Sequence, residues 1–320
     1  ETYKSIEARN SKTVNTLVMG PWRHGGWARG EGSFFGDIPF NAKTSEFYRE
    51  KIEFPFFQRH LKGKGEAEHP EAWVFEMGTN QWRKYDRWPP KTARSKSLYF
   101  HAGQRLAFEP PGKNADRGDY DQSLSDPDKP VPYMNGILAG MKAEYMIADQ
   151  RFASRRPDVL VYQTGELEED VTLVGPIEVD LTVSTSGTDS DWVVKLIDVY
   201  PDDYPDPAKN PREVRMGGYQ QLVRGDVIRG KFRKSMEKPE PFEPNKPSRV
   251  RFTMPDTYHC FRSGHRIMVQ VQSSWFPLVD RNPQKFCDIF RAVESDYQAA
   301  TQRVYRSPKA VSRLKVMVLP

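Results

Sequence analysis

The chain has 320 residues and a mass of 37.0 kDa, which at ~100–200 residues per domain predicts two domains, or one large domain with an appendage. Its net charge of +5 is spread among 48 basic and 43 acidic residues, without the local excess that a nucleic-acid-binding face needs, so we expect no nucleic-acid partner. No stretch approaches the ~18 apolar residues that span a bilayer, and we expect no membrane partner.

The two cysteines, Cys260 and Cys287, are too few for a disulfide scaffold or a four-cysteine zinc site. The sequence leaves open whether the two form one disulfide bridge or remain two free thiols. His259, Cys260 and His265 lie close in sequence, but zinc needs a fourth ligand at compact spacing. We therefore assign no metal site, and the sequence predicts no cofactor.

Two further patterns have ordinary structural explanations beside functional ones. Asp189 and Asp191 form an Asp-x-Asp pair, which favours a turn capped by its own side chains over a calcium site. Four tryptophans would suit a sugar platform, but such residues are more often found in a core or at a domain seam. They are Trp73, Trp82, Trp88 and Trp275.

The first region, roughly residues 1–65, starts an α/β pattern. Thr16–Met19 is a short, wholly apolar run that ends at a Gly-Pro pair, and a run without alternation is typical of a strand buried on both faces in a parallel sheet. A glycine-rich loop follows over residues 22–36.

A helix is expected after this loop, from about Thr44 to Leu61. Apolar residues four apart predict it, Pro55 should kink it, and Gly63 is a natural stop. Strand, loop and helix make half of an α/β unit, which is not a domain by itself.

Residues 66–95 are predicted to be a connector, with a strand over Glu71–Gly78 and a turn-rich stretch from Asn80 to Pro90. From about 96 to 320 the sequence is β-rich, because short runs either alternate apolar and polar residues or, at 192–200, are apolar on both faces apart from Lys195 and Asp198. These runs lie at 177–183, 192–200, 267–271 and 314–318. Many short strands separated by Gly and Pro turns predict a β-sandwich or jelly roll.

His24, in the glycine-rich loop, has the position of a catalytic base. Sites in open α/β sheets form beyond the carboxyl ends of strands, and a histidine there can move protons. Two glycines after it allow a substrate to approach closely. The alternative is a loop histidine hydrogen-bonded to backbone. Trp22, Arg23 and Trp27 are weaker candidates for substrate binding.

A nucleophile for His24 is missing from the sequence. No Gly-x-Ser-x-Gly motif occurs, and in α/β-hydrolases the triad follows the order Ser, then Asp or Glu, then His. A chain that starts shortly before the histidine would lack the first two members. The sequence is therefore expected to be the C-terminal portion of a longer enzyme, inactive alone.

Four motifs follow one another along the chain: Met19–His24, Pro55–Phe57 with Leu61–Gly63, Phe75–Trp82 and Trp88–Pro90. In this order they resemble the CocE/NonD hydrolases, which include α-amino acid ester hydrolases, glutaryl acylases, cocaine esterase and X-prolyl dipeptidyl aminopeptidases. The stretches at 184–200 and 264–283 are most similar to the α-amino acid ester hydrolases.

The resemblance implies a mostly β chain. Residues 1–65 would be the C-terminal end of an α/β-hydrolase domain, 66–95 a connector, and 96–320 a jelly-roll β-sandwich of the X-Pro dipeptidyl-peptidase C-terminal type. It also implies a Ser-His-Asp triad, of which only the histidine maps here, onto His24.

The resemblance further implies the reaction and the partners. The enzyme would cleave small acyl ester, amide or peptide substrates. The partners would be the upstream part of the same hydrolase and further copies of the chain in a homo-oligomer. Members of the family are often periplasmic or secreted.

A second hypothesis is a jelly-roll carbohydrate-binding module without a catalytic role, because jelly rolls serve both purposes. The strand–histidine–helix unit at the start of the chain distinguishes the two, since a free-standing lectin has no use for it.

Overall fold

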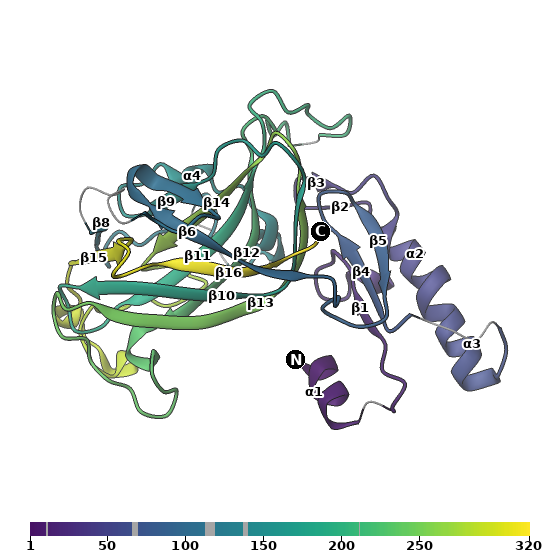
Figure 1. Ribbon diagram of the computed structural model, residues 1–320, viewed down its shortest axis with the longest axis horizontal. Helices are drawn as coiled ribbons and strands as arrows, with labels where there is room; N and C mark the ends of the chain where they lie inside the picture. Colours follow the sequence, from purple (N-terminus) through teal and green to yellow (C-terminus); the bar gives the residue numbers. More distant parts are fainter. Residues whose placement is uncertain (11, 66–69, 113–118, 137–139, 211) are drawn as a thin grey trace.

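The computed structural model describes residues 1–320 apart from 11, 66–69, 113–118, 137–139 and 211. A small N-terminal unit lies beside a large β-sandwich (Figure 1). Within the described ranges, no helix is long and apolar enough to cross a membrane.

The N-terminal unit is built on a three-stranded sheet in the order β1-β4-β5. Strand β1 lies parallel to β4, and β5 is antiparallel to β4. A small hairpin, four helical segments and a short 3-10 helix at Gly26–Ala28 complete the unit. The elements are α1 (Thr2–Arg9), β1 (Leu17–Met19), β2 (Phe34–Phe35), β3 (Ile38–Pro39), α2 (Thr44–Phe47), η2 (Tyr48–Glu53), α3 (Phe54–Lys62), β4 (Ala72–Glu76) and β5 (Gln81–Tyr85).

Two predictions for this unit need correction. Strand β1 forms as predicted, but it is not buried on both faces: Met19 is 52% exposed, because β1 is the edge strand of this sheet. The stretch from Asn80 to Pro90 is not all turn, because β5 pairs with β4 along its whole length. The turn between them is confined to Gly78–Asn80, where Gly78 and Asn80 have positive φ.

The predicted helix is three consecutive helical segments. Between α2 and α3, the π-helical segment η2 widens the turn, and the Phe54 N–H donates to the Arg49 carbonyl. This π-helical segment ends just before Pro55, whose missing N–H removes one α-helical hydrogen bond. Gly63 ends the helix in the left-handed conformation at φ 63°, as predicted.

Eleven strands form the sandwich as one hydrogen-bonded sheet in the order β12-β11-β14-β9-β7-β6-β16-β10-β15-β8, with β13 paired to β10. The predicted mostly β fold class, with its C-terminal jelly roll, is confirmed. The strands are β6 (Arg94–His101), β7 (Arg105–Ala107), β8 (Tyr120–Ser125), β9 (Leu160–Gln163), β10 (Val171–Thr185), β11 (Asp191–Val199), β12 (Gln220–Arg229), β13 (Ser248–Phe261), β14 (Arg266–Gln272), β15 (Ala300–Tyr305) and β16 (Arg313–Val318).

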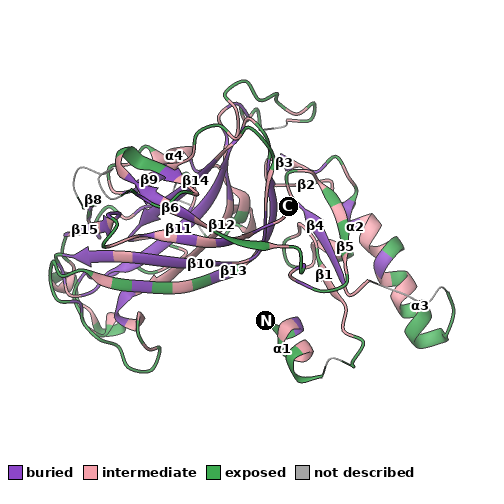
Figure 2. Ribbon diagram, viewed as in Figure 1, coloured by how far each residue is buried: buried purple, intermediate pink, exposed green. Residues whose placement is uncertain are grey.

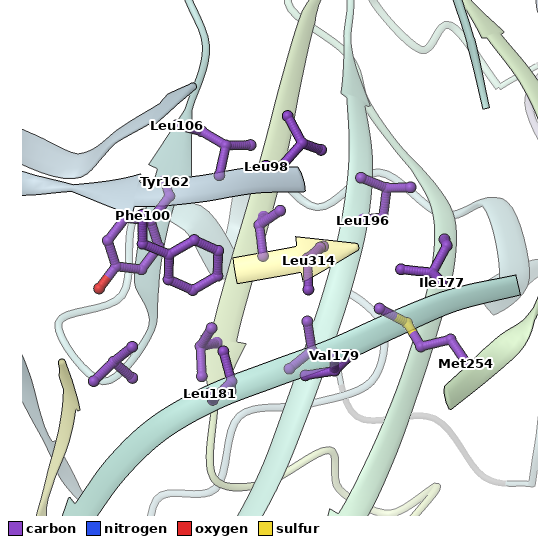
Figure 3. Close-up of a cluster of buried hydrophobic side chains, with 14 of the residues drawn as sticks. Leu98, Phe100, Leu106, Tyr162, Ile177, Val179, Leu181, Leu196, Met254 and Leu314 are labelled. Atoms are coloured by element: carbon purple, nitrogen blue, oxygen red, sulfur yellow. The ribbon is translucent and has the colours of Figure 1, made fainter. Parts of the chain in front are cut away.

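One apolar core fills the sandwich. Alternating residues of β10, such as Val179 and Leu181, point inward, where Leu314 of β16 and Leu196 of β11 meet them (Figure 3). Strand β11 is buried along its whole length, as predicted from a run that is apolar on both faces apart from Lys195 and Asp198 (Figure 2). The core therefore joins all the strands whose alternation is visible in the sequence.

A buried carboxylate links three of these strands. Asp180 on β10 is fully buried and accepts hydrogen bonds from Arg249 and Arg251 on β13 and from Arg313 on β16. Burial alone would raise the pKa of Asp180, but the hydrogen bonds from Arg249 and Arg251 outweigh it and lower the pKa to about 2.

Asp180→Asn should lower the free energy of unfolding at pH 7 by about 2–3 kcal/mol, because it removes a charge-assisted network. The folded pKa lies below the ordinary 3.8, so this stabilisation is present above pH 4 and is lost as the pH falls toward 2. Urea unfolding at several pH values measures both effects.

The matched control is Glu178→Gln on the same strand. Glu178 is 41% exposed and pairs with Lys315, so its loss should cost less than about 1 kcal/mol. Equal losses in the two variants would contradict the role given to Asp180.

Candidate functional site

His24 lies in the loop that follows the carboxyl end of β1. The Gly26 N–H donates to the Arg23 carbonyl, and Gly25 adopts φ 75°, so the chain turns sharply at the histidine. The turn leaves His24 exposed on the surface. Its ring meets the Trp27 ring edge-on, with 5.7 Å between centroids. We call residues 20–36 the histidine loop.

Trp22 anchors the base of the histidine loop. Its Nε1 donates to Thr44 Oγ1 at 2.9 Å, and its ring packs against Tyr48 and Trp82. The ring lies over Gly20, where a Cβ would approach within 2.4 Å of it. Trp22, predicted as a weak substrate-binding candidate, is thus engaged inside the N-terminal unit.

The other two substrate-binding candidates differ in exposure. Arg23 is exposed, and Trp27 is half-buried between the rings of Trp22 and His24. Both therefore lie beside the imidazole, at the surface of the loop.

Three residues of α2 and η2 hold the loop, and sequence reasoning missed them. Thr44 Oγ1 donates to the Gly32 carbonyl at 2.6 Å, and Ser45 Oγ to that of Gly26 at 3.0 Å. Arg49 donates to the carbonyls of Trp27 and Gly30. The one sequence signal for these contacts was the pair of hydroxyl residues at the start of the helix, since hydroxyls there commonly bond nearby backbone.

A cavity of about 170 Å³ lies at the foot of the histidine loop. Gly20–Trp22 forms one wall, and residues of the sandwich segment, including Met146, Arg224 and Asp256, form others. His24 is outside this lining, so the cavity meets the base of the loop rather than the imidazole.

The other histidines near this junction are bound to a buried acid. His259 Nε2 and His265 Nδ1 each lie 2.8 Å from an oxygen of Asp198, and all three side chains are buried. Burial raises the pKa of Asp198, but the hydrogen bonds from the histidines outweigh it and lower it. In the described part of the chain, no three His, Cys, Asp or Glu residues are placed to hold a metal ion.

The cysteines and the Asp-x-Asp pair have structural roles. Cys260 and Cys287 are both free thiols. Asp189 accepts a hydrogen bond from the neighbouring Ser190 N–H, which caps its own turn, and another from the distant Lys231 N–H, which ties that turn to the segment after β12. Asp191 pairs with Arg229, and burial is the main reason that its pKa rises to about 6.

The tryptophans considered for a sugar platform are packed inside the molecule. Trp73, Trp88 and Trp275 are at most 7% exposed. Trp82 is stacked on Phe47, 5.5 Å between centroids. None of the four offers a free ring face comparable to a lectin platform, so no observation favours the carbohydrate-binding hypothesis.

The family of the chain follows from comparison with known proteins. Residues 65–315 match the model of the X-Pro dipeptidyl-peptidase C-terminal non-catalytic domain. The chain belongs to this family. The predicted resemblance to the CocE/NonD hydrolases is confirmed, and the chain carries the C-terminal domain of these serine hydrolases. His24 lies outside the matched, non-catalytic domain.

Related proteins are hydrolases of about twice the length. Cocaine esterase of Rhodococcus is 30% identical over an alignment of 332 positions, which covers 100% of this chain and 54% of that protein. An aminopeptidase from a marine sediment Thaumarchaeota archaeon is 37% identical with a TM-score of 0.92, over 99% of this chain and 52% of its own. An α-amino acid ester hydrolase is 41% identical with a TM-score of 0.92, over the same shares. The chain spans about half the length of these relatives.

Two glycines of the histidine loop give a matched test of how tightly it is held. Gly30 and Gly32 both have positive φ, but a Cβ at Gly32 would lie 2.1 Å from Ser45 Oγ, whereas one at Gly30 meets nothing within 4 Å. Gly30→Ala should cost only the backbone strain of roughly 1–2 kcal/mol. Gly32→Ala should cost about 1–3 kcal/mol more. Urea unfolding followed by tryptophan fluorescence measures the difference, and equal costs would show that the loop does not need this contact.

Proposed function

We propose that this chain is the C-terminal part of a serine hydrolase that cleaves acyl ester or amide bonds, with His24 as its catalytic base. The observation that carries the proposal is the place of His24: an exposed imidazole on a pinned loop, directly beyond the carboxyl end of β1, which is parallel to β4. The relatives, an esterase, an ester hydrolase and an aminopeptidase, support acyl chemistry on esters and amides.

The mechanism follows from the logic of the triad. A serine from the remaining half of the hydrolase attacks the carbonyl carbon of the substrate, while His24 accepts the serine proton. The tetrahedral intermediate collapses, and His24 returns that proton to the leaving alcohol or amine. Water then repeats the sequence on the acyl-enzyme. An acid outside this chain orients the imidazole, because no described side chain hydrogen-bonds to His24.

Exposed apolar residues on the N-terminal unit support a missing catalytic half. Phe54, Phe57 and Leu61, at spacings of three and four, present one apolar side of α3, and they are 62%, 50% and 76% exposed. Met19 at the end of β1 is also exposed. We propose that the remaining half of the hydrolase covers this side of α3, because contiguous exposed apolar patches commonly mark protein–protein contact surfaces.

His24→Ala in the complete hydrolase should lower kcat/KM for an aryl acyl ester by ~10³–10⁶-fold, because the serine loses its base. His60→Ala, which removes another exposed imidazole from the same unit, serves as the matched control and should leave kcat/KM unchanged. Steady-state kinetics on both variants decide the point, and near-normal turnover in His24→Ala would refute the assignment.

Phe57→Glu should reduce the binding of a hydrophobic dye to this chain and impair association with the catalytic half, because the charge interrupts the apolar side of α3. Phe290→Glu is the control, since Phe290 is 90% exposed on the sandwich rather than on α3. Dye fluorescence and co-purification of the two halves measure the effects. If Phe57→Glu and Phe290→Glu bind the catalytic half equally well, this side of α3 is not the contact.

A further inference from the structure

Arg49 bridges two backbone carbonyls of the histidine loop. Its Nη1 donates to the Trp27 carbonyl at 3.0 Å, and its Nη2 donates to the Gly30 carbonyl at 2.8 Å. The guanidinium thus closes the stretch from Trp27 to Gly30 with two donors of one planar group. Such a fork fixes direction as well as distance, which a single ammonium does not.

The helix delivers Arg49 on the same side as the other residues that hold the loop. Thr44, Ser45, Tyr48 and Arg49 all contact the histidine loop; they are two adjacent pairs four residues apart, a spacing that places them on one side of the helix. Arg49 belongs to the π-helical segment η2, and its own carbonyl accepts from the Phe54 N–H. Short π-helical turns inside helices are frequent at functional sites.

A short path joins Arg49 to the imidazole. The carbonyl that Arg49 holds belongs to Trp27, and the Trp27 ring contacts His24 edge-on. Ser45 fixes the preceding residue, since its Oγ donates to the Gly26 carbonyl. Arg49 itself does not touch His24. Its influence therefore passes through the backbone and the ring of Trp27.

We propose that Arg49 is a positioning residue for His24: its bidentate contact holds the Trp27–Gly30 backbone, and through the Trp27 ring it fixes the orientation of the imidazole toward the serine. This inference rests on the proposed function. A catalytic base must be held close to its productive geometry, and a displacement of ~1 Å remote from the reacting atoms can cost ~10²-fold in rate.

Kinetics of the complete hydrolase test the proposal. Arg49→Ala should lower kcat about 10- to 100-fold with little change in KM, because the substrate still binds while the base is misaligned. Arg49→Lys should recover part of the loss, since an ammonium reaches one carbonyl but not both. The matched control is Lys51→Ala, which removes an exposed cation from the same π-helical segment; Lys51 makes no hydrogen bond or ion pair with any described residue.

A second readout reports on the loop itself. Arg29 is exposed within the stretch that Arg49 closes, so limited digestion with trypsin should cut after Arg29 faster in Arg49→Ala than in wild type or Lys51→Ala. Mass spectrometry of the fragments measures the rate. Thermal unfolding of each variant shows whether the fold is intact, and if Arg49→Ala does not fold, Arg49→Lys decides the question by its kcat.

The outcomes separate the two proposals. Unchanged kcat and unchanged cleavage in folded Arg49 variants overturn the positioning role, and the proposed function stands if His24→Ala is still inactive. Normal turnover in His24→Ala removes the proposed function itself, whatever Arg49 does. A rise in KM with kcat unchanged also overturns the inference, because it would place Arg49 in substrate binding.

Discussion

Strand β4 is paired on both edges and buried along its whole length, and its position fixes that of the histidine loop. On one edge it pairs with β1, whose end leads into His24. Just past its end, the Met77 N–H donates to the Tyr258 carbonyl, and the Cys260 N–H donates to the Met77 carbonyl. Gly78 then passes so close to Cys260 that a Cβ there would lie 2.0 Å from its carbonyl oxygen. A shift of β4 would therefore move the loop and the sandwich relative to each other.

Hydrogen bonds between the N-terminal unit and the sandwich also secure this junction. Asp256 on β13 accepts from Lys4 Nζ at 2.8 Å and from Trp88 Nε1 at 2.7 Å. The hydroxyls of Tyr85 and Tyr258 are hydrogen-bonded across the same seam. These contacts come from α1, from β5 and from the segment after it, so the N-terminal unit is attached at several separate places. The sandwich, whose matched family is described as a non-catalytic domain, is thus bonded to the unit that carries His24.

The sandwich contains buried polar groups that also restrict how it packs. Burial lowers the pKa of Lys195 to about 7, and its Nζ donates to Gln150 Oε1 at 3.0 Å. Asp198, three residues further along β11, is bound by two histidines. Each of these groups is costly to bury without its partner, so one arrangement of the strands is favoured over others of similar apolar burial. One histidine of the pair, His259, lies opposite Met77 at the seam.

The sequence determined the elements whose signal is local. Alternation predicted the inward faces of β10, β14 and β16, a mostly apolar run predicted β11, and a glycine predicted the end of α3 at Gly63. The motif around His24 identified the loop and, through a family resemblance, the class of protein. Only the tertiary structure decided what holds that loop, because Thr44, Ser45 and Arg49 act on carbonyl groups, and a carbonyl is present at every residue and leaves no mark in the sequence. The exposure of β1 and the pairing of Asp198 with His259 and His265 were likewise decided by contacts between distant strands, where partner choice depends on the fold rather than on residue type.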